Sequence, residues 1–217
     1  MSAPASVTLC VADTHRVLVD TLGPGRRAVV WVQGCSLGCK GCLVPESWNP
    51  RSRGDDVDPV RLAHELLGDD PDVHLTVSGG EPTEQAAGVA ALLAAAQRLG
   101  RTTWVYTGHT LEELLAADDA DVLELLAHTD VLVDGRFDQV RAGAYPYRGS
   151  GNQRILRLTE AISEADATGG VPGRVEFLVD ADGVLTLMGI PTPGFLTELT
   201  ERLRARGLQV RHDSAWR

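Results

Sequence analysis

The chain has 217 residues, of which 43% are hydrophobic, and its 30 acidic and 20 basic residues give a net charge of −10. This balance argues against nonspecific nucleic-acid binding, which depends on neutralising phosphates with Lys and Arg. No run approaches the ~18 apolar residues of a membrane span, and the first residues lack the charged start and apolar stretch of a signal peptide. We expect a cytoplasmic protein with one domain, or one domain and an appendage.

The N-terminal part of the chain predicts short strands. Residues 6–11 and 16–19 read as two strands around a polar turn at 13–15. Cys10 lies in the first of them, and we interpret it as a small core residue because free cysteine is frequently buried. Gly-Pro-Gly at 23–25 interrupts the pattern, and residues 28–33 form the next strand.

The middle of the chain predicts alternating strands and helices. After an irregular stretch at 50–58 come helices at 59–68, 84–99, 110–116 and 121–128, and strands at 73–77, 102–106 and 131–133. Such alternation indicates parallel βα units, whose right-handed crossovers bring the loops after the strands to one edge of the sheet. The loops at 35–42, 78–82, 107–108 and 134 should therefore meet where α/β proteins bind their ligands.

The tail from residue 159 has a different pattern. Strands at 174–179 and 184–188 flank residues 180–183, in which Asp182-Gly183 is a strong hairpin signal. An apolar stripe predicts a final helix that ends at Gly207, and residues 208–211 suggest one more strand. The stripe consists of Phe195, Leu196, Leu199 and Leu203. We divide the chain into a core at 1–158 and an extension at 159–217 that packs on it.

The densest chemical signal is CSLGCKGC, which contains Cys35, Cys39 and Cys42 in a C-x3-C-x2-C spacing. Glycines between the cysteines allow tight backbone turns, so three thiolates can converge on one soft metal centre. A [4Fe–4S] cluster usually takes one Cys per iron, so three ligands leave one iron open for a group that is not protein. An open coordination position favours chemistry over a purely structural role.

Three other interpretations of the loop carry less weight. A structural zinc would need a fourth ligand from Cys10 or a histidine, and the usual second ligand pair is missing from the sequence. A disulfide is disfavoured in a cytosolic protein. The three cysteines could also be buried and unreactive, but a glycine-rich loop is a poor place to bury three side chains.

The cysteine spacing after a strand resembles that of the radical S-adenosylmethionine (SAM) superfamily. Within it, GPGRRAVVWVQGC at 23–35 and VPESW at 44–48 resemble the cluster loop of glycyl-radical-enzyme activases, and LTVSGGEP at 75–82 resembles their SAM-binding loop. Three further segments resemble the anaerobic ribonucleotide reductase activating proteins, in the same order: WVYTGHTLEEL at 104–114, DVLVDGRFD at 130–138 and YRGSGNQRIL at 147–156. The resemblance covers residues 17–158, and the extension is a departure from it.

The resemblance implies a partial (β/α)6 radical SAM barrel with a mostly parallel sheet, followed here by a hairpin and a helix. It also implies a [4Fe–4S] cluster on the three cysteines, whose electron cleaves SAM to a 5′-deoxyadenosyl radical. That radical would take a hydrogen atom from a glycine of a glycyl radical enzyme, with a reductase like the anaerobic ribonucleotide reductase as protein substrate. A flavodoxin or ferredoxin would supply the electron.

The resemblance assigns the cofactor contacts residue by residue. Ser78, Gly79, Gly80 and Glu81 would hold SAM, with Glu81 accepting from its ammonium group; the alternative is a tight turn in which Glu81 caps the next helix. Asp134-x-Arg136 resembles an Asp-x-Lys element near SAM, although Arg and Lys are not interchangeable. Thr107 and Asn152 are contacts by position only, or turn residues. No side chain is given a catalytic role beyond the cluster and SAM.

Two other functions remain open at this point. A radical SAM enzyme that modifies a peptide or small molecule would keep the same cofactors and change the substrate. An iron–sulfur protein that only transfers electrons would bind a cluster and would not cleave SAM.

Overall fold

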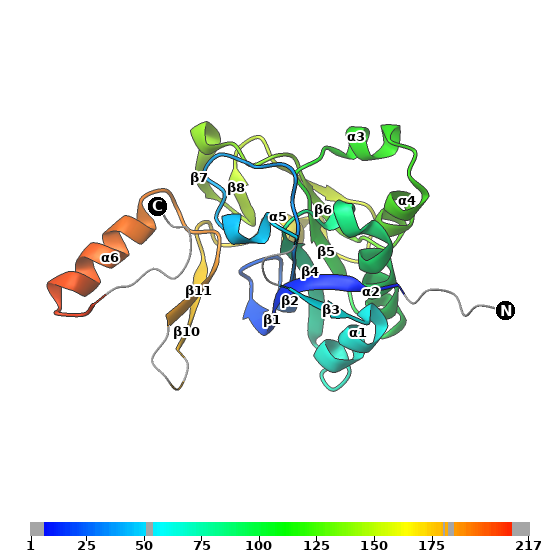
Figure 1. The fold of residues 1–217 in the computed structure, drawn as a ribbon, viewed down its shortest axis with the longest axis horizontal. Coiled ribbons are helices and arrows are strands. Elements are labelled where there is room, and N and C mark those ends of the chain that lie inside the picture. Colours follow the sequence, from blue (N-terminus) through cyan, green and yellow to red (C-terminus); the bar gives the residue numbers. More distant parts are fainter. Residues whose placement is uncertain (1–6, 51–53, 180, 182–184, 210–217) are drawn as a thin grey trace.

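The computed structural model describes residues 7–50, 54–179, 181 and 185–209, which form a mixed α/β fold (Figure 1). Within these residues the main sheet has seven strands in the order β3-β1-β2-β4-β5-β6-β9. These strands are β1 Leu9–Val19, β2 Arg26–Val32, β3 Asp55–Val57, β4 Val73–Gly79, β5 Thr103–Tyr106, β6 Val131–Asp134 and β9 Arg154–Arg157. Two further hairpins pair β7 Ala142–Tyr145 with β8 Arg148–Ser150, and β10 Val175–Val179 with β11 Leu185–Gly189.

The centre of the sheet is parallel. Strands β2, β4, β5 and β6 pair in parallel, while β1, β3 and β9 are antiparallel to their neighbours. The predicted α/β class with a mostly parallel central sheet is confirmed. In the described part of the chain the sheet stays open, with β3 and β9 as its two edge strands.

Helices cover one face of the sheet. The helices are α1 Pro59–Leu67, α2 Ala86–Arg98, α3 Leu111–Ala116, α4 Ala120–Ala127, α5 Glu164–Thr168 and α6 Phe195–Ala205, with 3-10 turns η1 Pro45–Ser47, η2 Pro82–Gln85 and η3 Gln139–Arg141. Buried aliphatic residues of α1, α2 and α4 pack with those of β2, β4, β5 and β6 in the largest core cluster. No helix of the described residues has both the length and the apolar character to cross a bilayer.

Local sequence signals explain where these helices begin. Asp58 accepts hydrogen bonds from the first free N–H groups of α1, and Pro59 needs none. Thr110 and Glu113 form the predicted capping box at the start of α3. Gly100 follows α2 in a left-handed conformation, as expected for a residue that ends a helix.

The opposite, inner face of the sheet carries a second set of contacts. Trp104 packs there with Tyr147 from the segment after β6, their ring centroids 5.3 Å apart. Arg27 is buried beside them, and its guanidinium donates to the hydroxyl of Thr76 at 2.8 Å and to the carbonyl of Leu75 at 2.6 Å. These bonds satisfy a charge that would otherwise be costly to bury.

Two sequence predictions were wrong near the N-terminus. The expected turn at 13–15 lies inside β1, which runs continuously against β2 and absorbs two register shifts, between Val11 and Asp13 and between His15 and Leu18. The stretch at 50–58 includes β3, which pairs with the start of β1. In both cases a partner strand distant in sequence decides the local structure.

The C-terminal extension contains the predicted hairpin and helix. Its turn residues Asp182 and Gly183, and residues 210–211 of the suggested last strand, lie outside the described residues. Helix α6 has no buried residue and extends away from the sheet, at the left of Figure 1. Among the described residues of the extension, Ile162 and Ala167 pack against the main sheet and Met188 of the hairpin packs against β1 and β2, whereas α6 contributes no buried residue.

The core predicts a clear response to truncation. Leu93 of α2 is fully buried, so Leu93→Ala should lower the free energy of unfolding by about 2–5 kcal/mol through lost burial and a residual cavity. Leu115→Ala is the matched control, since Leu115 of α3 is 52% exposed and should change stability by no more than about 0.5 kcal/mol. Urea denaturation of the apo protein measures both, and equal effects would contradict the assigned core.

Candidate functional site

An open pocket lies at the carboxyl edge of the parallel strands. It is lined from four loops, those that follow β2, β4, β5 and β6, as the strand order predicted. The lining residues are Cys35, Leu37, Cys39, Cys42, Leu43, Trp48, Ser78, Gly79, Gly80, Glu81, Tyr106, Thr107, Gly108, Gly135, Phe137, Gly149, Gln153 and Ile190. All three cysteines of the motif and the whole Ser-Gly-Gly-Glu segment therefore face one space.

The cysteine loop is closed at its base by main-chain bonds. The N–H of Gly34 donates to Ser47 at 2.7 Å, and the N–H of Cys35 donates to Trp48 at 3.0 Å, so the loop's two ends meet like paired strands. The amide of Gln33 donates to the carbonyls of Glu46 and Asn49 beneath it. This explains the segment VPESW, whose backbone is the clamp of the loop.

A second anchor ties the cysteine loop to the turn η2. The carboxylate of Glu84 accepts from both the N–H and the hydroxyl of Ser36, at 2.7 and 2.5 Å. The next residue, Gln85, donates to the carbonyls of Gln33 and Cys10. Ser36, one of the three residues between Cys35 and Cys39, is thus positioned by the loop after β4.

The Gly79-Gly80 segment touches the start of the cysteine loop along its backbone. A Cβ at Gly79 would lie 2.6 Å from the nitrogen of Val32, and one at Gly80 would lie 2.1 Å from the carbonyl oxygen of Gly34. The N–H of Gly80 donates to Val32 at 2.7 Å, and that of Glu81 donates to Gly34 at 2.8 Å. Only glycine fits such an approach of two backbones.

The three cysteine side chains are half-buried and free of disulfide bonds. Burial raises the pKa of Cys35 and Cys39, although N–H groups of Leu37 and Gly38 donate to Cys35 and the N–H of Phe137 donates to Cys39. Burial thus favours the protonated form of the Cys35 and Cys39 thiols, and a metal would displace the protons on binding.

No group of three or more His, Cys, Asp and Glu side chains in the described residues is close enough to hold a single metal ion. A cluster places fewer demands on sulfur spacing, since each cysteine bonds a different iron. Three thiols from one loop, with hydrogen-bond donors to two of their sulfurs, fit the donor set of a [4Fe–4S] cluster with one open iron.

Glu81 is 1% exposed and its carboxylate is held by four protein donors. Oε1 accepts from the N–H and hydroxyl of Thr83 at 3.0 and 2.8 Å and from the hydroxyl of Thr107 at 2.9 Å. Oε2 accepts from the N–H of Gly108 at 2.8 Å. The carboxylate therefore caps η2, as its alternative interpretation required, and also joins the loop after β4 to the loop after β5.

Asp134 is fully buried and faces away from the lining of the pocket. Its carboxylate accepts from the N–H of Leu111 at 2.8 Å and from the Nε of Arg154 at 2.9 Å, with a second bond to the same guanidinium. Arg154 also pairs with Glu112 on the surface. The position of Asp134 is thus explained by its ion pair with Arg154. Arg136, two residues later, is exposed.

The pair of Arg154 with Glu112 adds a pH-dependent contribution. The hydrogen bond from Arg154 lowers the pKa of Glu112 to about 2. A carboxylate whose pKa is lower in the folded than in the unfolded state stabilises the fold at pH values above its unfolded-state pKa. That contribution is lost as the pH falls through about 2. Because Glu112 is on the surface, solvent and salt screen the effect.

Asn152 lies beside the pocket and is not part of its lining in the described residues. Its amide nitrogen donates to the carbonyl of Arg136 at 2.7 Å, and its carbonyl oxygen is buried without a hydrogen-bond partner among the described residues. A free acceptor next to the pocket-lining Gln153 is compatible with the predicted cofactor contact, which stays a prediction. Ser78 and Thr107, two of the predicted cofactor contacts, line the pocket.

Several lining residues were not predicted as site residues. Trp48 and Phe137 add aromatic walls, while Tyr106, Gln153 and Ile190 come from later elements. The signal for Tyr106 was present, because it ends the strand before Thr107. No local signal distinguished Ile190, which enters the pocket only through the packing of the C-terminal hairpin.

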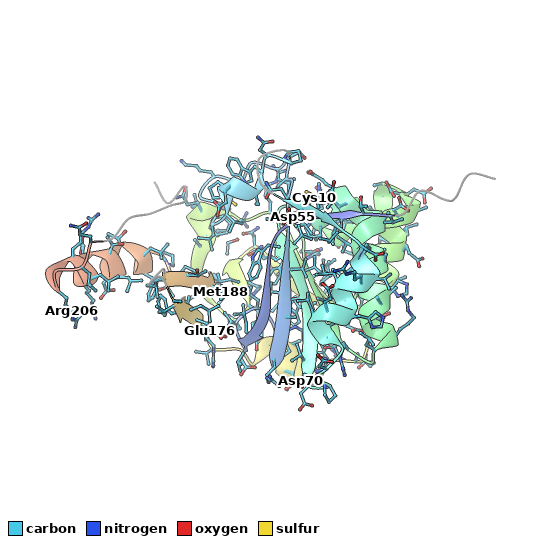
Figure 2. All side chains as sticks on the ribbon, turned by 60° about the horizontal axis from the view of Figure 1, so that its bottom comes forward. Cys10, Asp55, Asp70, Glu176, Met188 and Arg206 are labelled. Carbon is cyan, nitrogen blue, oxygen red and sulfur yellow. The ribbon has the colours of Figure 1, made fainter. Side chains whose placement is uncertain are left out.

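Cys10, the fourth cysteine, is not among the residues that line the pocket. It is half-buried, its pKa is raised by burial and by the nearby Asp56 and Asp55, and Figure 2 shows it beside Asp55. Its position in β1 makes it a structural residue and a suitable control for the motif cysteines.

Comparison with known proteins finds similarity over the part of the chain that contains the motif cysteines and the Ser78–Glu81 segment. Residues 21–156 match a family described as "4Fe-4S single cluster domain", which is more than half of the chain. The anaerobic ribonucleoside-triphosphate reductase-activating protein of Pasteurella multocida (strain Pm70) is 35% identical over 149 residues, covering 64% of this chain and 91% of that protein. Its counterpart in Haemophilus influenzae (strain ATCC 51907 / DSM 11121 / KW20 / Rd) is 37% identical over 147 residues, covering 63% and 90%.

More distant likenesses extend the comparison. The activating protein of Enterobacteria phage T4 is 29% identical over 150 residues, covering 66% of this chain and 92% of its own length. Among solved structures, QueE from Escherichia coli is similar over 48% of this chain and 53% of that chain, with a TM-score of 0.41 and 14% identity. At that score we base no conclusion on the structural likeness.

The Glu81 network predicts sensitivity to loss of one acceptor. Glu81→Gln replaces an accepting oxygen with a donating amide, so at least one of the four buried donors loses its partner, at a cost of about 1–3 kcal/mol in unfolding free energy. Glu124→Gln is the control, because Glu124 is 64% exposed and bonds only His128 in the described residues. Urea denaturation measures both variants, and an unchanged Glu81→Gln midpoint would refute the network.

The Asp134 pair predicts a structural effect. Asp134→Asn presents an amide to the Arg154 guanidinium and should cost about 1–3 kcal/mol in unfolding free energy, whereas Glu112→Gln on the same arginine should cost less, because Glu112 is exposed and solvent screens its ion pair. Denaturation and SAM binding should be measured together. Normal stability with weakened SAM binding would instead assign Asp134 to the cofactor, as the resemblance predicted.

Proposed function

Because the chain belongs to the 4Fe-4S single cluster domain family, together with the anaerobic ribonucleoside-triphosphate reductase-activating proteins, we propose that it is a radical SAM activase. Its target is a glycyl radical enzyme of the anaerobic ribonucleotide reductase type. The observation that carries this proposal is the single pocket in which Cys35, Cys39 and Cys42 meet the Ser78–Glu81 segment.

The bound cofactors supply the chemistry, and the chain supplies ligands and surroundings. When bound, a [4Fe–4S] cluster and SAM would supply the reducing electron and the radical that abstracts a glycine hydrogen. Cys35, Cys39 and Cys42 would be the thiolate ligands of that cluster. The Ser-Gly-Gly-Glu segment lines the same pocket and would hold the methionyl part of SAM.

The Gly79–Glu81 backbone is better suited than the Glu81 carboxylate to bind an ammonium group. Four protein donors already occupy the carboxylate, and the side chain is almost completely buried. Gly79 and Gly80 line the pocket without a side chain, so their peptide groups are the atoms that a ligand would meet there. We therefore assign Glu81 to positioning this segment and the glycine backbone to contact with the cofactor.

Apolar side chains limit water in the pocket. Leu37, Leu43, Trp48, Phe137 and Tyr106 all contribute to the walls. Tyr106 keeps its hydroxyl hydrogen in a bond to the carbonyl of Tyr147 at 3.0 Å. A dry, open-sided pocket protects a reactive species and still admits a peptide segment of a partner enzyme.

We further propose the reaction partners and setting. A flavodoxin or ferredoxin supplies the electron, and the reaction takes place in the cytoplasm, where thiolate ligands stay reduced. The division into a core at 1–158 and an extension at 159–217 is part of the same proposal, since the family match ends at residue 156.

One observation favours a second candidate function. The extension lies beyond the family match and still reaches the pocket through Ile190. A radical SAM enzyme that modifies a different peptide or a small molecule would use such a change of pocket wall. Activation of a purified anaerobic ribonucleotide reductase, followed by its glycyl radical signal, discriminates between the two.

The first test is anaerobic reconstitution. Protein loaded with iron and sulfide, reduced and given SAM should form 5′-deoxyadenosine. Cys39→Ala should lose both the cluster absorbance and the product, because one iron loses its ligand. Cys10→Ala should keep both, since Cys10 is not among the residues that line the pocket.

Two outcomes would count against the proposal. A Cys10→Ala variant that lost its cluster as fully as Cys39→Ala would mean that the motif cysteines are not the specific ligands. A well-formed cluster that never cleaved SAM, even with a partner enzyme present, would favour simple electron transfer.

A further inference from the structure

The C-terminal hairpin is fastened to the first hairpin of the chain. The carboxylate of Glu176 in β10 accepts from the N–H of Val19 at 2.6 Å and also from the hydroxyl of Thr21, which is buried. Figure 2 shows Glu176 and Met188 on the hairpin strands beside β1 and β2. Hydrogen bonds to a charged acceptor are strong, so these two bonds fix the position of β10 relative to the end of β1.

The second strand of the hairpin packs into the inner face. Met188 of β11 is 4% exposed and joins Leu18, Leu22 and Val29 in a buried cluster. Gly189, with φ +119, lies so close that a Cβ there would meet Thr21 Cγ2 at 2.6 Å. This is a close-packed contact between segments that are far apart in the sequence.

The residue that follows this contact lies in the pocket. Ile190 is partly buried, packs against the same cluster together with Trp31 and Tyr106, and lines the pocket that contains the motif cysteines. Tyr106 lines the pocket as well, so two of the residues that pack against this cluster also form part of the pocket wall. The position of Ile190 depends on Met188 and Gly189, which immediately precede it.

We propose that the C-terminal extension is a wall of the SAM pocket and that Ile190 is a specificity-determining residue that limits its size. The proposal rests on the proposed function, because it assumes that SAM occupies this pocket. The extension lies outside the matched family region at 21–156, so the wall is a property of this chain's own tail. Exposed residues of the hairpin, such as Leu178, have no part in it.

The wall makes a prediction about size at one position. Ile190→Trp places a larger side chain in the pocket and should weaken SAM binding more than tenfold. Ile190→Ala removes apolar contact area and should weaken it by about three- to tenfold. Leu178→Trp and Leu178→Ala are matched controls, because Leu178 is 46% exposed on the same hairpin, and they should leave SAM binding unchanged.

The measurement is equilibrium dialysis of labelled SAM with reconstituted protein, without a partner enzyme. Iron content is measured on each reconstituted variant, and the thermal midpoint is measured on each apo variant. Both should match those of the unaltered protein. Ile190→Ala serves as the readout if Ile190→Trp fails to fold.

Each outcome decides between the two proposals. SAM bound equally by the unaltered protein and by the folded Ile190 variants overturns the wall and leaves the proposed function intact. Failure of the unaltered, cluster-loaded protein to bind SAM overturns the proposed function and the wall with it. Weakening at Ile190 together with unchanged Leu178 variants supports both.

Discussion

The site depends on the contact of two backbones, that of Gly79-Gly80 with that of residues 32–34. The two main-chain bonds between them join the loop after β4 to the first residues of the cysteine loop. A side chain on either glycine would force the loops apart, since a Cβ would lie within 2.6 Å of main-chain atoms. The distance between the cluster ligands and the opposite wall is therefore set by peptide groups, which have fewer conformations than side chains.

Two carboxylates beside this contact, the buried Glu81 and the exposed Glu84, join neighbouring loops. Glu81 follows the glycines and binds the loop after β5, while Glu84 binds back to Ser36 between the cysteines. Each carboxylate thus crosses from one loop to another. Networks of this kind rigidify a site when every member has a partner, and the loops that meet here come from three different strands.

Much of this arrangement could be predicted from the sequence because its signals are local. Alternating periodicity placed the parallel strands, and the position of Cys35, Gly79 and Thr107 directly after strands placed them at one edge. The helices predicted at 59–68 and 110–116 are present as α1 and α3, with Asp58 and Thr110 as their N-caps. For Glu81, the structure shows the cap of the following 3-10 turn and a place in the pocket lining, and its predicted contact with the ammonium group of SAM stays a prediction.

The remaining features depend on partners far along the chain. The course of β1 past residues 13–15 follows from its pairing with β2 and β3, not from its own turn-forming residues. Asp134 is oriented by Arg154, 20 residues later, and no motif near Asp134 announces that arginine. Ile190 is placed by the seat of β11 on the inner face, which periodicity within a five-residue strand does not indicate.

The long-range attachment of the hairpin also bears on the order of assembly. The bond from Val19 to Glu176 closes a loop of 157 residues, whereas the clamp of the cysteine loop from Gly34 to Ser47 spans only part of one connection. Contacts between distant segments carry the larger entropic cost of closure and tend to form late in folding. During synthesis the cysteine loop is complete long before β10 leaves the ribosome. Metal loading therefore has a period in which the ligands are formed and the last wall has not yet docked.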